Sequence, residues 1–311
     1  MMRRRTAGVG AVAVCFQGSR VDVARVERID NARPVLELCA SVRHEGSEVE
    51  TLSRLRREHG LARVPCVTLM YEGDYQLQAI DAPGVPDEEL KEAVRWRLKD
   101  VLDYPADAAT VDVVSVPAGP NAPIRGNSVY AVAARNELIA ARMAAFSEAK
   151  LSLKVIDIPE LAQRNVAAMF ETPGSALAML SLTADRGLLT FTAGGELYLA
   201  RAIDVGLSQL RHADGELRIQ LFDRLVLEVQ RSLDHFDRQF SHLPVNKLVL
   251  APLPEDVGLQ VYLSQNMYVE TEEAHLQDCM DISRVPELAS RTVQGEYFMT
   301  IGAALRQEMS W

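Results

Sequence analysis

The sequence predicts an α/β protein with mixed sheets and two domains. Apolar runs of strand length recur along the chain, and segments with helical apolar spacing separate them. The same order, three short strands followed by helices, occurs twice, although no residue-level repeat accompanies it. The chain has 311 residues, and at about 150 residues per domain this length predicts two domains.

The first half is expected to begin with an antiparallel meander. Short turns separate its strands, and the next apolar run is continuous, which is typical of a central strand. The expected elements are strands at Val9–Phe16, Arg20–Ile29 and Val35–Val42, a helix at Val49–His59 ended by Gly60, and strands at Pro65–Tyr71 and Tyr75–Ala79.

Two prolines and a glycine in Asp81–Pro86 indicate a boundary, after which helices and strands alternate. The polar residues Asp87 and Asn136 are expected to cap the two longer helices. The expected elements are helices at Glu88–Leu102, Glu137–Ala149 and Pro159–Phe170, strands at Val111–Val116, Ser128–Ala134 and Val155–Ile158, and a loop at Pro117–Asn127.

Thr172-Pro173-Gly174 indicates the main domain boundary, which gives domains of residues 1–171 and 172–311. The second half repeats the meander and continues with a long amphipathic helix. Its acidic stretch from Glu270–Glu273 through Asp281 is expected to be solvated. The expected elements are strands at Ala176–Leu182, Leu188–Ala193, Leu197–Ile203, Lys247–Ala251 and Gln260–Leu263, a helix at Glu216–Phe240, and a terminal helix or strand-helix unit at Tyr297–Glu308.

Composition excludes several classes of function. With 43 acidic and 33 basic residues and a net charge of −10, the chain is unsuited to non-specific binding of nucleic acid or anionic membranes. Its four cysteines lack C-x-x-C spacing, so neither a disulfide framework nor a zinc site is expected, and a reducing cytoplasm fits best. The spacing of the histidines does not predict a metal site. The sequence also lacks a Gly-x-Ser-x-Gly nucleophile-elbow motif, so nucleophilic catalysis is not expected.

The start of the chain, Met1–Arg5 followed by an apolar stretch to Phe16, has the pattern of a signal peptide. The stretch is short, and the apolar pattern continues beyond it as a strand, so we expect no leader here. No apolar run reaches the 18 residues or more that a membrane span requires.

Five strings along the chain carry a family resemblance. In order, they are Val85–Asp100 with Tyr104-Pro105 and Val111-Asp112, Val132-Ala133-Ala134, Val155–Ala162, Glu228–Phe236 and Thr300–Arg306. Together these strings resemble the PilM pilus proteins of the actin-like ATPase superfamily. The resemblance covers nearly the whole chain, and the Arg95–Asp100 segment of the first string is most similar to MshI-type members from the MSHA pilus system.

The resemblance implies an actin-like, ribonuclease H-like fold of two domains. An inserted subdomain of the FtsA/PilM type would span about residues 84–158, and a long helix region about residues 207–242. It further implies a cytoplasmic protein, peripheral at the inner face of the inner membrane through its partners. In the family pattern, the N-terminal tail of a PilN-like membrane protein lies in a groove between the first subdomain and the inserted one.

An actin-like ATPase needs two phosphate-binding hairpins and a glycine-rich adenosine loop, and the aligned positions here depart from that pattern. The family's carboxylate falls on Cys15, its glycine on Gln17 and its lysine on Asp22, where a carboxylate would repel phosphate. We therefore expect a pseudo-ATPase that has no catalytic residue and binds no metal or cofactor. Neither ATP nor magnesium is expected to bind. The vestigial positions are Cys15, Gln17, Gly18, Ser19 and Asp22, then Ser181, Thr183, Asp185 and Gly187, and on the adenosine side Ala251 and Pro252.

The expected function is that of a non-enzymatic scaffold of a type IV, MSHA-type pilus platform that binds a PilN-like tail and other platform proteins. Arg95, Trp96 and Tyr104 are the candidate partner-binding residues, although Trp96 also suits a cap on a small hydrophobic cluster. Two alternatives remain open: an active ATPase with atypical ligands, and a GspL-like component of a type II secretion platform, which the lack of a membrane span after residue 311 disfavours. Self-association also remains open.

Overall fold

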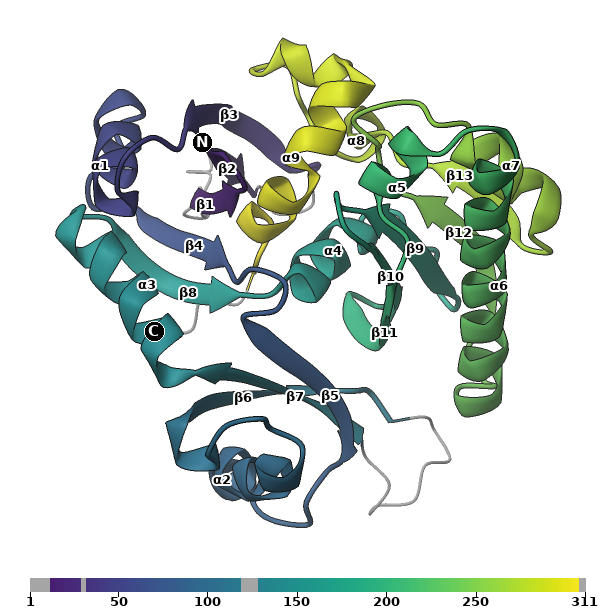
Figure 1. Cartoon of the computed structure of the whole chain (residues 1–311), viewed down its shortest axis with the longest axis horizontal. Coiled ribbons are helices and arrows are strands. Elements are labelled where there is room, and N and C mark those ends of the chain that lie inside the picture. Colours follow the sequence, from purple (N-terminus) through teal and green to yellow (C-terminus); the bar gives the residue numbers. More distant parts are fainter. Residues whose placement is uncertain (1–11, 29–31, 119–127, 308–311) are drawn as a thin grey trace, which may run out of the picture. The chain divides into compact units, whose positions relative to one another are not determined.

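The computed structural model describes residues 12–28, 32–118 and 128–307, and Figure 1 shows its helices and strands. The charged segment Met1–Arg5 and most of the predicted loop Pro117–Asn127 lie outside these residues. Contacts divide the chain into a larger unit, of Met1–Val14, Asp22–Ser41 and Pro159–Trp311, and a smaller unit, of Cys15–Val21 and Val42–Ile158. The predicted domain boundary at residues 171/172 stays a prediction.

Two five-stranded sheets share one strand order, with the first strand of each in the centre. This repetition confirms the predicted duplication of a meander followed by helices. The first sheet has the order β3-β2-β1-β4-β8, with β1 (Val12–Gln17), β2 (Arg20–Glu27), β3 (Val35–Arg43), β4 (Pro65–Leu69) and β8 (Ser152–Asp157). The second has the order β11-β10-β9-β12-β13, with β9 (Ala176–Leu182), β10 (Gly187–Ala193), β11 (Glu196–Ile203), β12 (Val245–Leu250) and β13 (Glu270–Glu273).

The second sheet is mixed, because β10 is antiparallel to β9 and β11 whereas β12 is parallel to β9 and β13. A return to the parallel direction requires a crossover connection, which α5 (Leu207–His212) and α6 (Gly215–Gln239) supply. The α6 helix buries one face, where Phe236 stacks on Phe191 with ring centroids 4.8 Å apart. The predicted long helix is thus confirmed as a core helix.

A separate three-stranded antiparallel sheet has the order β5-β7-β6, with β5 (Tyr75–Asp81), β6 (Ala109–Ser115) and β7 (Ser128–Arg135). We call this the inserted sheet, and α2 (Asp87–Arg97) packs on one of its faces through Val94 and, just beyond the helix, Leu98. The inserted sheet therefore spans residues 75–135. The resemblance implied about residues 84–158, but β5 belongs to the inserted sheet and β8 to the first sheet.

The remaining helices connect or cover these sheets. A capping box of Ser47 and Glu50 starts α1, and the side-chain amide of Asn165 on α4 donates to the carbonyl of Gly302 on α9. Gly302 also lies directly against the carbonyl of Ala162, where a side chain would clash. The bounds are α1 (Glu48–Glu58), α3 (Asn136–Glu148), α4 (Pro159–Ala167), α7 (Leu259–Asn266), α8 (Leu276–Cys279) and α9 (Arg291–Ala304), with short 3-10 turns at Leu98–Asp100, Ala106–Ala108 and Pro286–Ala289.

One predicted element of the second half was wrong, and one predicted stretch has a secondary structure that its sequence did not indicate. The predicted strand Gln260–Leu263 lies in helix α7, because Gly258 starts a helix with φ of 81° and Leu259 and Leu263 are buried one turn apart. In the acidic stretch that was expected to be solvated, Glu270, Asp278 and Asp281 are exposed, whereas Glu273 is half-buried beside Arg291. Residues Glu270–Glu273 form strand β13, which pairs with β12, and Lys247 pairs with Glu272 at 2.5 Å.

Two predicted helix caps were also wrong. Asp87 is the first residue of α2 rather than its cap, and Pro86 precedes it without a side-chain bond. Asn136 is likewise the first residue of α3, and its side chain instead bonds Thr110 and Asp107. The four cysteines are thiols, and none of them is in a disulfide. Among the described residues, no helix combines the length and the apolar character needed to cross a membrane.

Candidate functional site: a groove beside the inserted sheet

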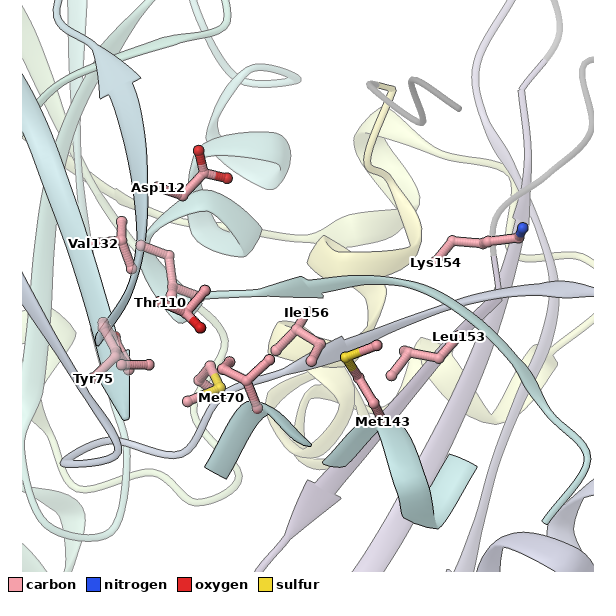
Figure 2. Close-up of a pocket in the computed structure, with 12 residues that line it drawn as sticks. Met70, Tyr75, Thr110, Asp112, Val132, Met143, Leu153, Lys154 and Ile156 are labelled. Atoms are coloured by element: carbon pink, nitrogen blue, oxygen red, sulfur yellow. The ribbon is translucent and has the colours of Figure 1, made fainter. Parts of the chain in front are cut away.

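The smaller unit contains a groove of about 280 Å³ between the inserted sheet, α3 and β8 (Figure 2). Most of its lining side chains are apolar, and we call this apolar lining the floor. A few polar and charged side chains lie among them, which is the usual composition of a recognition site. The lining residues are Met70, Tyr75, Thr110, Asp112, Val132, Ala134, Ile139, Met143, Leu153, Lys154, Ile156 and Ile158.

A β-bulge in β8 shapes one wall of this groove. Cys66 of β4 pairs with Leu153 and Val67 pairs with Val155, so Lys154 is an extra residue on β8. A regular strand would place Leu153 and Ile156 on opposite faces, but the inserted residue brings both to the groove together with Lys154. Because β8 is also the last strand of its sheet among the described residues, this wall is a strand edge.

The inserted sheet forms the opposite wall with one of its two faces. Strand alternation separates Thr110 and Asp112, which line the groove, from Ala109 and Val111, which pack against α2. The hydroxyl of Thr110 donates to the side-chain oxygen of Asn136 at 2.7 Å. This bond fixes the start of α3 to the inserted sheet, so the two walls are tied together at one end.

Helix α3 supplies Ile139 and Met143 to the groove. Met143 is 57% exposed, which is unusual for an apolar side chain of this size. On the same helix, the guanidinium of Arg142 lies 4.3 Å from the centre of the Phe16 ring and 3.7 Å from the carboxylate of Glu48. Arg142 therefore holds α3 in place and leaves the adjacent methionine presented to the groove.

Two charged side chains are among the described residues that line the groove, and they have opposite signs. The carboxylate of Asp112 pairs with Lys91 at 2.7 Å and accepts from the backbone N–H of Val113. Lys154 is exposed on the other wall. No group of three or more His, Cys, Asp or Glu residues suited to a metal occurs in the part of the chain that the structure describes. The arrangement suits recognition of an extended apolar segment with polar ends.

None of the predicted partner-binding residues lines this groove. Trp96 is 65% exposed on α2, and Arg95 pairs with Glu92 at 2.8 Å on the same helix. Tyr104 packs against the α2 side of the inserted sheet with the guanidinium of Arg135 at 4.1 Å. These residues belong to the face of the sheet opposite the groove, and their role in binding stays a prediction.

The first vestigial hairpin joins β1 to β2. Cys15 and Asp22 are fully buried, whereas Gly18 and Ser19 form an exposed turn in which Gly18 has a φ of 58°. The carbonyl of Ser19 accepts from the backbone N–H of His44 at 2.7 Å. Gln17, the last residue of β1 before this turn, is half-buried. The structure thus places a thiol and a carboxylate in the interior on either side of this exposed turn, and their correspondence to the family's nucleotide-binding positions stays a prediction.

The second vestigial hairpin is closed by internal bonds. The hydroxyl of Ser181 donates to the side chain of Gln163, a fully buried residue that also donates to Thr190 and to two backbone carbonyls. Thr183 and Arg186 bond each other across the turn. Gly187 begins β10, buried against Leu182.

The tip of this hairpin is covered on its backbone side. Asp185 has an exposed side chain, but its backbone lies against Gly206, where a side chain would clash. The backbone N–H groups of Leu207 and Ser208 donate to the carbonyls of Thr183 and Ala184. The start of α5 therefore holds this turn in one conformation.

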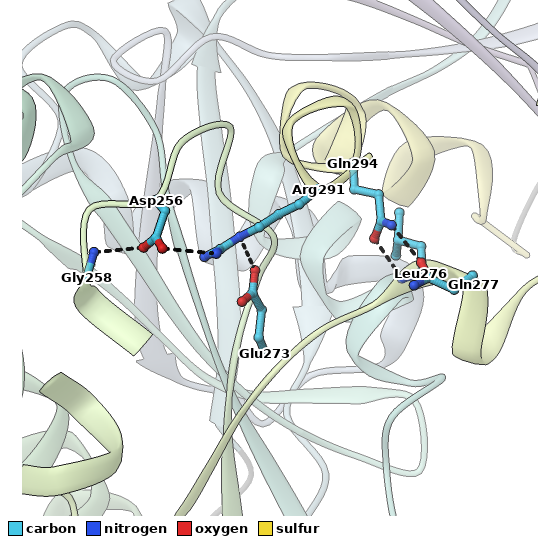
Figure 3. Close-up of polar contacts among 7 residues, drawn as sticks. All are labelled: Asp256, Gly258, Glu273, Leu276, Gln277, Arg291 and Gln294. Carbon is cyan, nitrogen blue, oxygen red and sulfur yellow. Dashed lines mark hydrogen bonds and ion pairs between the residues drawn. The ribbon is translucent and has the colours of Figure 1, made fainter. Parts of the chain in front are cut away.

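The loop after β12, which the sequence comparison predicted to correspond to the family's adenosine-side glycines, is packed against α9. Ala251 and Pro252 are buried, and a methyl group on Gly295 of α9 would lie 2.5 Å from the nitrogen of Pro254. Figure 3 shows Arg291 of α9 between Glu273 at 2.5 Å and Asp256 at 3.9 Å. Burial raises the pKa of Glu273, and Arg291 opposes that shift.

Gln294, one residue before Gly295, adds a second anchor for α9 (Figure 3). It is 1% exposed, accepts from the backbone N–H of Leu276 and donates to Gln277 and to the carbonyl of Leu288. These bonds fix α9 beside the loop. Sequence reasoning identified the loop but not the helix that covers it.

The duplicated sheet order and the inserted sheet define a class, the actin-like ATPase fold. A solved PilM–PilN type IV pilus biogenesis complex shares the fold with a TM-score of 0.74 at 20% identity, covering 96% of this chain and 98% of that chain. A Bacteroides thetaiotaomicron protein described as having an actin-like ATPase fold gives 0.49 at 9% identity, over 91% and 96%. The cytoplasmic domain of EpsL, an inner-membrane component of the Vibrio cholerae type II secretion system, gives 0.47 at 12% identity, over 77% and 81%.

Family assignment follows from the sequence itself. The model of the family described as type IV pilus assembly protein PilM matches residues 48–210, just over half of the chain. The chain therefore belongs to the PilM family, and the predicted resemblance is confirmed at this level. No curated protein sequence matches the chain.

Proposed function

We propose that this chain is a scaffold of a type IV pilus platform that holds the N-terminal cytoplasmic tail of a PilN-like inner-membrane protein in the groove. The observation that carries the proposal is the groove itself, in which an apolar floor and a strand edge lie side by side. An extended tail gains affinity from backbone pairing along β8 and from apolar side chains set between Met143 and Ile156. The PilM–PilN complex with the same fold supports a PilN-like partner.

The proposal includes a location and a subtype. A protein held by such a tail is cytoplasmic and peripheral at the inner face of the inner membrane. The Arg95–Asp100 segment, which resembles MshI, supports assignment to an MSHA-type system. Peptides from the tails of MSHA-type, other pilus and type II secretion partners, compared under identical conditions, test this subtype, which requires the MSHA-type tail to bind most tightly.

We also propose that the chain is a pseudo-ATPase. Its support is that the sequence alignment assigns Cys15 and Asp22 to the family's carboxylate and cation positions, and that Ser181 and the 251–254 loop are engaged in internal packing. The function is then recognition rather than nucleotide chemistry. Filter-binding with radiolabelled ATP and magnesium tests this, and micromolar affinity would contradict it.

Calorimetric titration of the tail peptide into wild-type protein and the variant Met143→Asp tests the binding site. We expect the variant to weaken binding at least tenfold, because a carboxylate would face the apolar floor. The matched control is Val101→Asp, since Val101 is 50% exposed in the same unit but does not line the groove. Equal binding by all three proteins would contradict the groove assignment.

A further inference from the structure

The outward face of α6 has a charge pattern that complements itself. With about 100° per residue, Leu227 points directly away from the buried stripe of Leu225, Val229 and Phe236. Asp223 lies one turn before Leu227 and Arg231 one turn after it, so the three form one i, i+4 row. All three are exposed, and Leu227 is 44% exposed.

We propose that this row, Asp223–Leu227–Arg231, is an interface between two copies of the chain, with the two α6 helices antiparallel. Rows at i, i+4 spacing pack side by side in the commonest class of helix pairs. In an antiparallel pair centred on Leu227, Asp223 of each copy lies beside Arg231 of the other, and the two leucines meet. A two-fold interface of this kind uses the same patch on both copies.

Neighbouring residues extend the apolar part of this surface. Ile219 is 50% exposed one turn before Asp223, and Val261 of α7 is 55% exposed. The hydroxyl of Tyr262, next to Val261, donates to the carboxylate of Asp223 at 2.6 Å, which fixes that carboxylate at the edge of the row. Arg231 pairs with Glu228 at 3.0 Å within its own helix, so a second carboxylate from the partner copy would complete a three-charge cluster.

The net charge of the chain opposes association of two copies, and only the local charge pattern of the row favours it. Each chain carries a charge of −10, and two such chains repel each other over long distances. At about 0.15 M salt, where the Debye length is about 8 Å, that repulsion is screened more than contacts at 3–4 Å. Dimerisation is therefore expected to be strongest at intermediate salt and to weaken at both lower and higher salt.

Complementary charge reversals test the proposal. Asp223→Arg places two arginines together at both ends of the row, and Arg231→Glu places two carboxylates together, so each variant is expected to be monomeric by analytical ultracentrifugation at concentrations where the wild type is dimeric. In an equimolar mixture of the two variants, the introduced arginine of one copy faces the introduced glutamate of the other. The unchanged Asp223 and Arg231 face each other at the opposite end of the row, so the mixture is expected to restore the dimer.

Two controls keep the test independent of local structure. Tyr262→Phe removes the hydrogen bond to Asp223 but keeps both charges, and it is expected to remain dimeric. Circular dichroism of each variant checks that α6 is intact. A wild type that stays monomeric at 100-fold the concentration of the peptide-binding assay would overturn the proposal, as would single variants that still dimerise or a mixture that does not. These outcomes leave the groove proposal unaffected, since the two sites share no residue.

Discussion

The groove and the vestigial nucleotide positions differ in what their side chains already contact. In the groove, Met143 is exposed and β8 is an edge strand among the described residues, so these groups are open to a partner. In the larger unit, Ser181 is bonded to Gln163 and the 251–254 loop lies against Gly295. The groove therefore offers an exposed side chain and a strand edge to a partner, whereas the side chains of the second hairpin and the 251–254 loop are already engaged within the chain.

The largest effect is expected from Gln163→Leu. Gln163 is fully buried and bonds the hydroxyls of Ser181 and Thr190 and the carbonyls of Met179 and Leu188. Its loss leaves several buried polar groups unsatisfied and is expected to cost about 3 kcal/mol or more. Thermal unfolding should show a fall in Tm of about 6–12 °C, with tail-peptide affinity unchanged below that temperature. A Tm within a degree of wild type would show that the Ser181 position is not held as described.

Gly295→Ala is expected to have the next largest effect. The added methyl group meets the backbone of the 252–254 loop, which cannot rotate away, so the strain is expected to cost about 1–3 kcal/mol. Chemical denaturation measures this loss, and Gly84→Ala is the matched control because a methyl group there meets no atom within 4 Å. Equal stability of the two variants would mean that the loop is not packed against α9 in solution.

Lys154→Glu sharpens the account of the groove. The chain is acidic overall, which favours a basic tail, and a carboxylate on the bulged strand is expected to strengthen tail binding about threefold to fivefold. The gain should disappear at about 1 M salt, where the Debye length is about 3 Å. Weaker binding by the variant at low salt would instead indicate that the tail places a carboxylate beside Lys154.

The smallest effect concerns pH and Glu273. Burial raises its pKa in the folded state, so folding favours the protonated carboxyl. Its contribution to stability is therefore present below the ordinary pKa of glutamate and is lost as the pH rises through the folded pKa. As the pH rises from about 4 to about 7, we expect the free energy of unfolding of the wild type to fall by less than about 1 kcal/mol relative to that of Glu273→Gln. Parallel urea denaturation curves at the two pH values measure the difference, and a constant or opposite difference would contradict it.

Much of the fold is readable from the sequence, because strand alternation and helical spacing report burial directly. The two meanders, the buried strand β4 and the helix α6 all follow from such patterns. Strand β13 does not, since its Glu-Thr-Glu-Glu sequence has no apolar period and it exists because β12 lies beside it. Helix α7 is short and depends on a left-handed Gly258, a conformation that apolar pattern does not reveal.

The candidate site is less predictable for a related reason. Resemblance placed a groove beside the inserted subdomain, but Leu153, Lys154 and Ile156 reach it together only through a bulge in β8. No single-strand pattern encodes a bulge, because it depends on the register with β4. Trp96 was predicted to bind a partner, and it is an exposed aromatic residue, but it lies on the α2 side of the inserted sheet, opposite the groove.

Thermal unfolding of one protein preparation, measured with a PilN-like tail peptide and separately with Mg-ATP, tests the central claim most directly. A free ligand concentration of about 100 times Kd adds roughly 2.7 kcal/mol to the free energy of unfolding. This raises Tm by several degrees in domains of this size. We predict that a PilN-like tail peptide produces this shift and that Mg-ATP at millimolar concentration produces none. A magnesium-dependent shift with ATP, together with no shift from the peptide, would contradict the account.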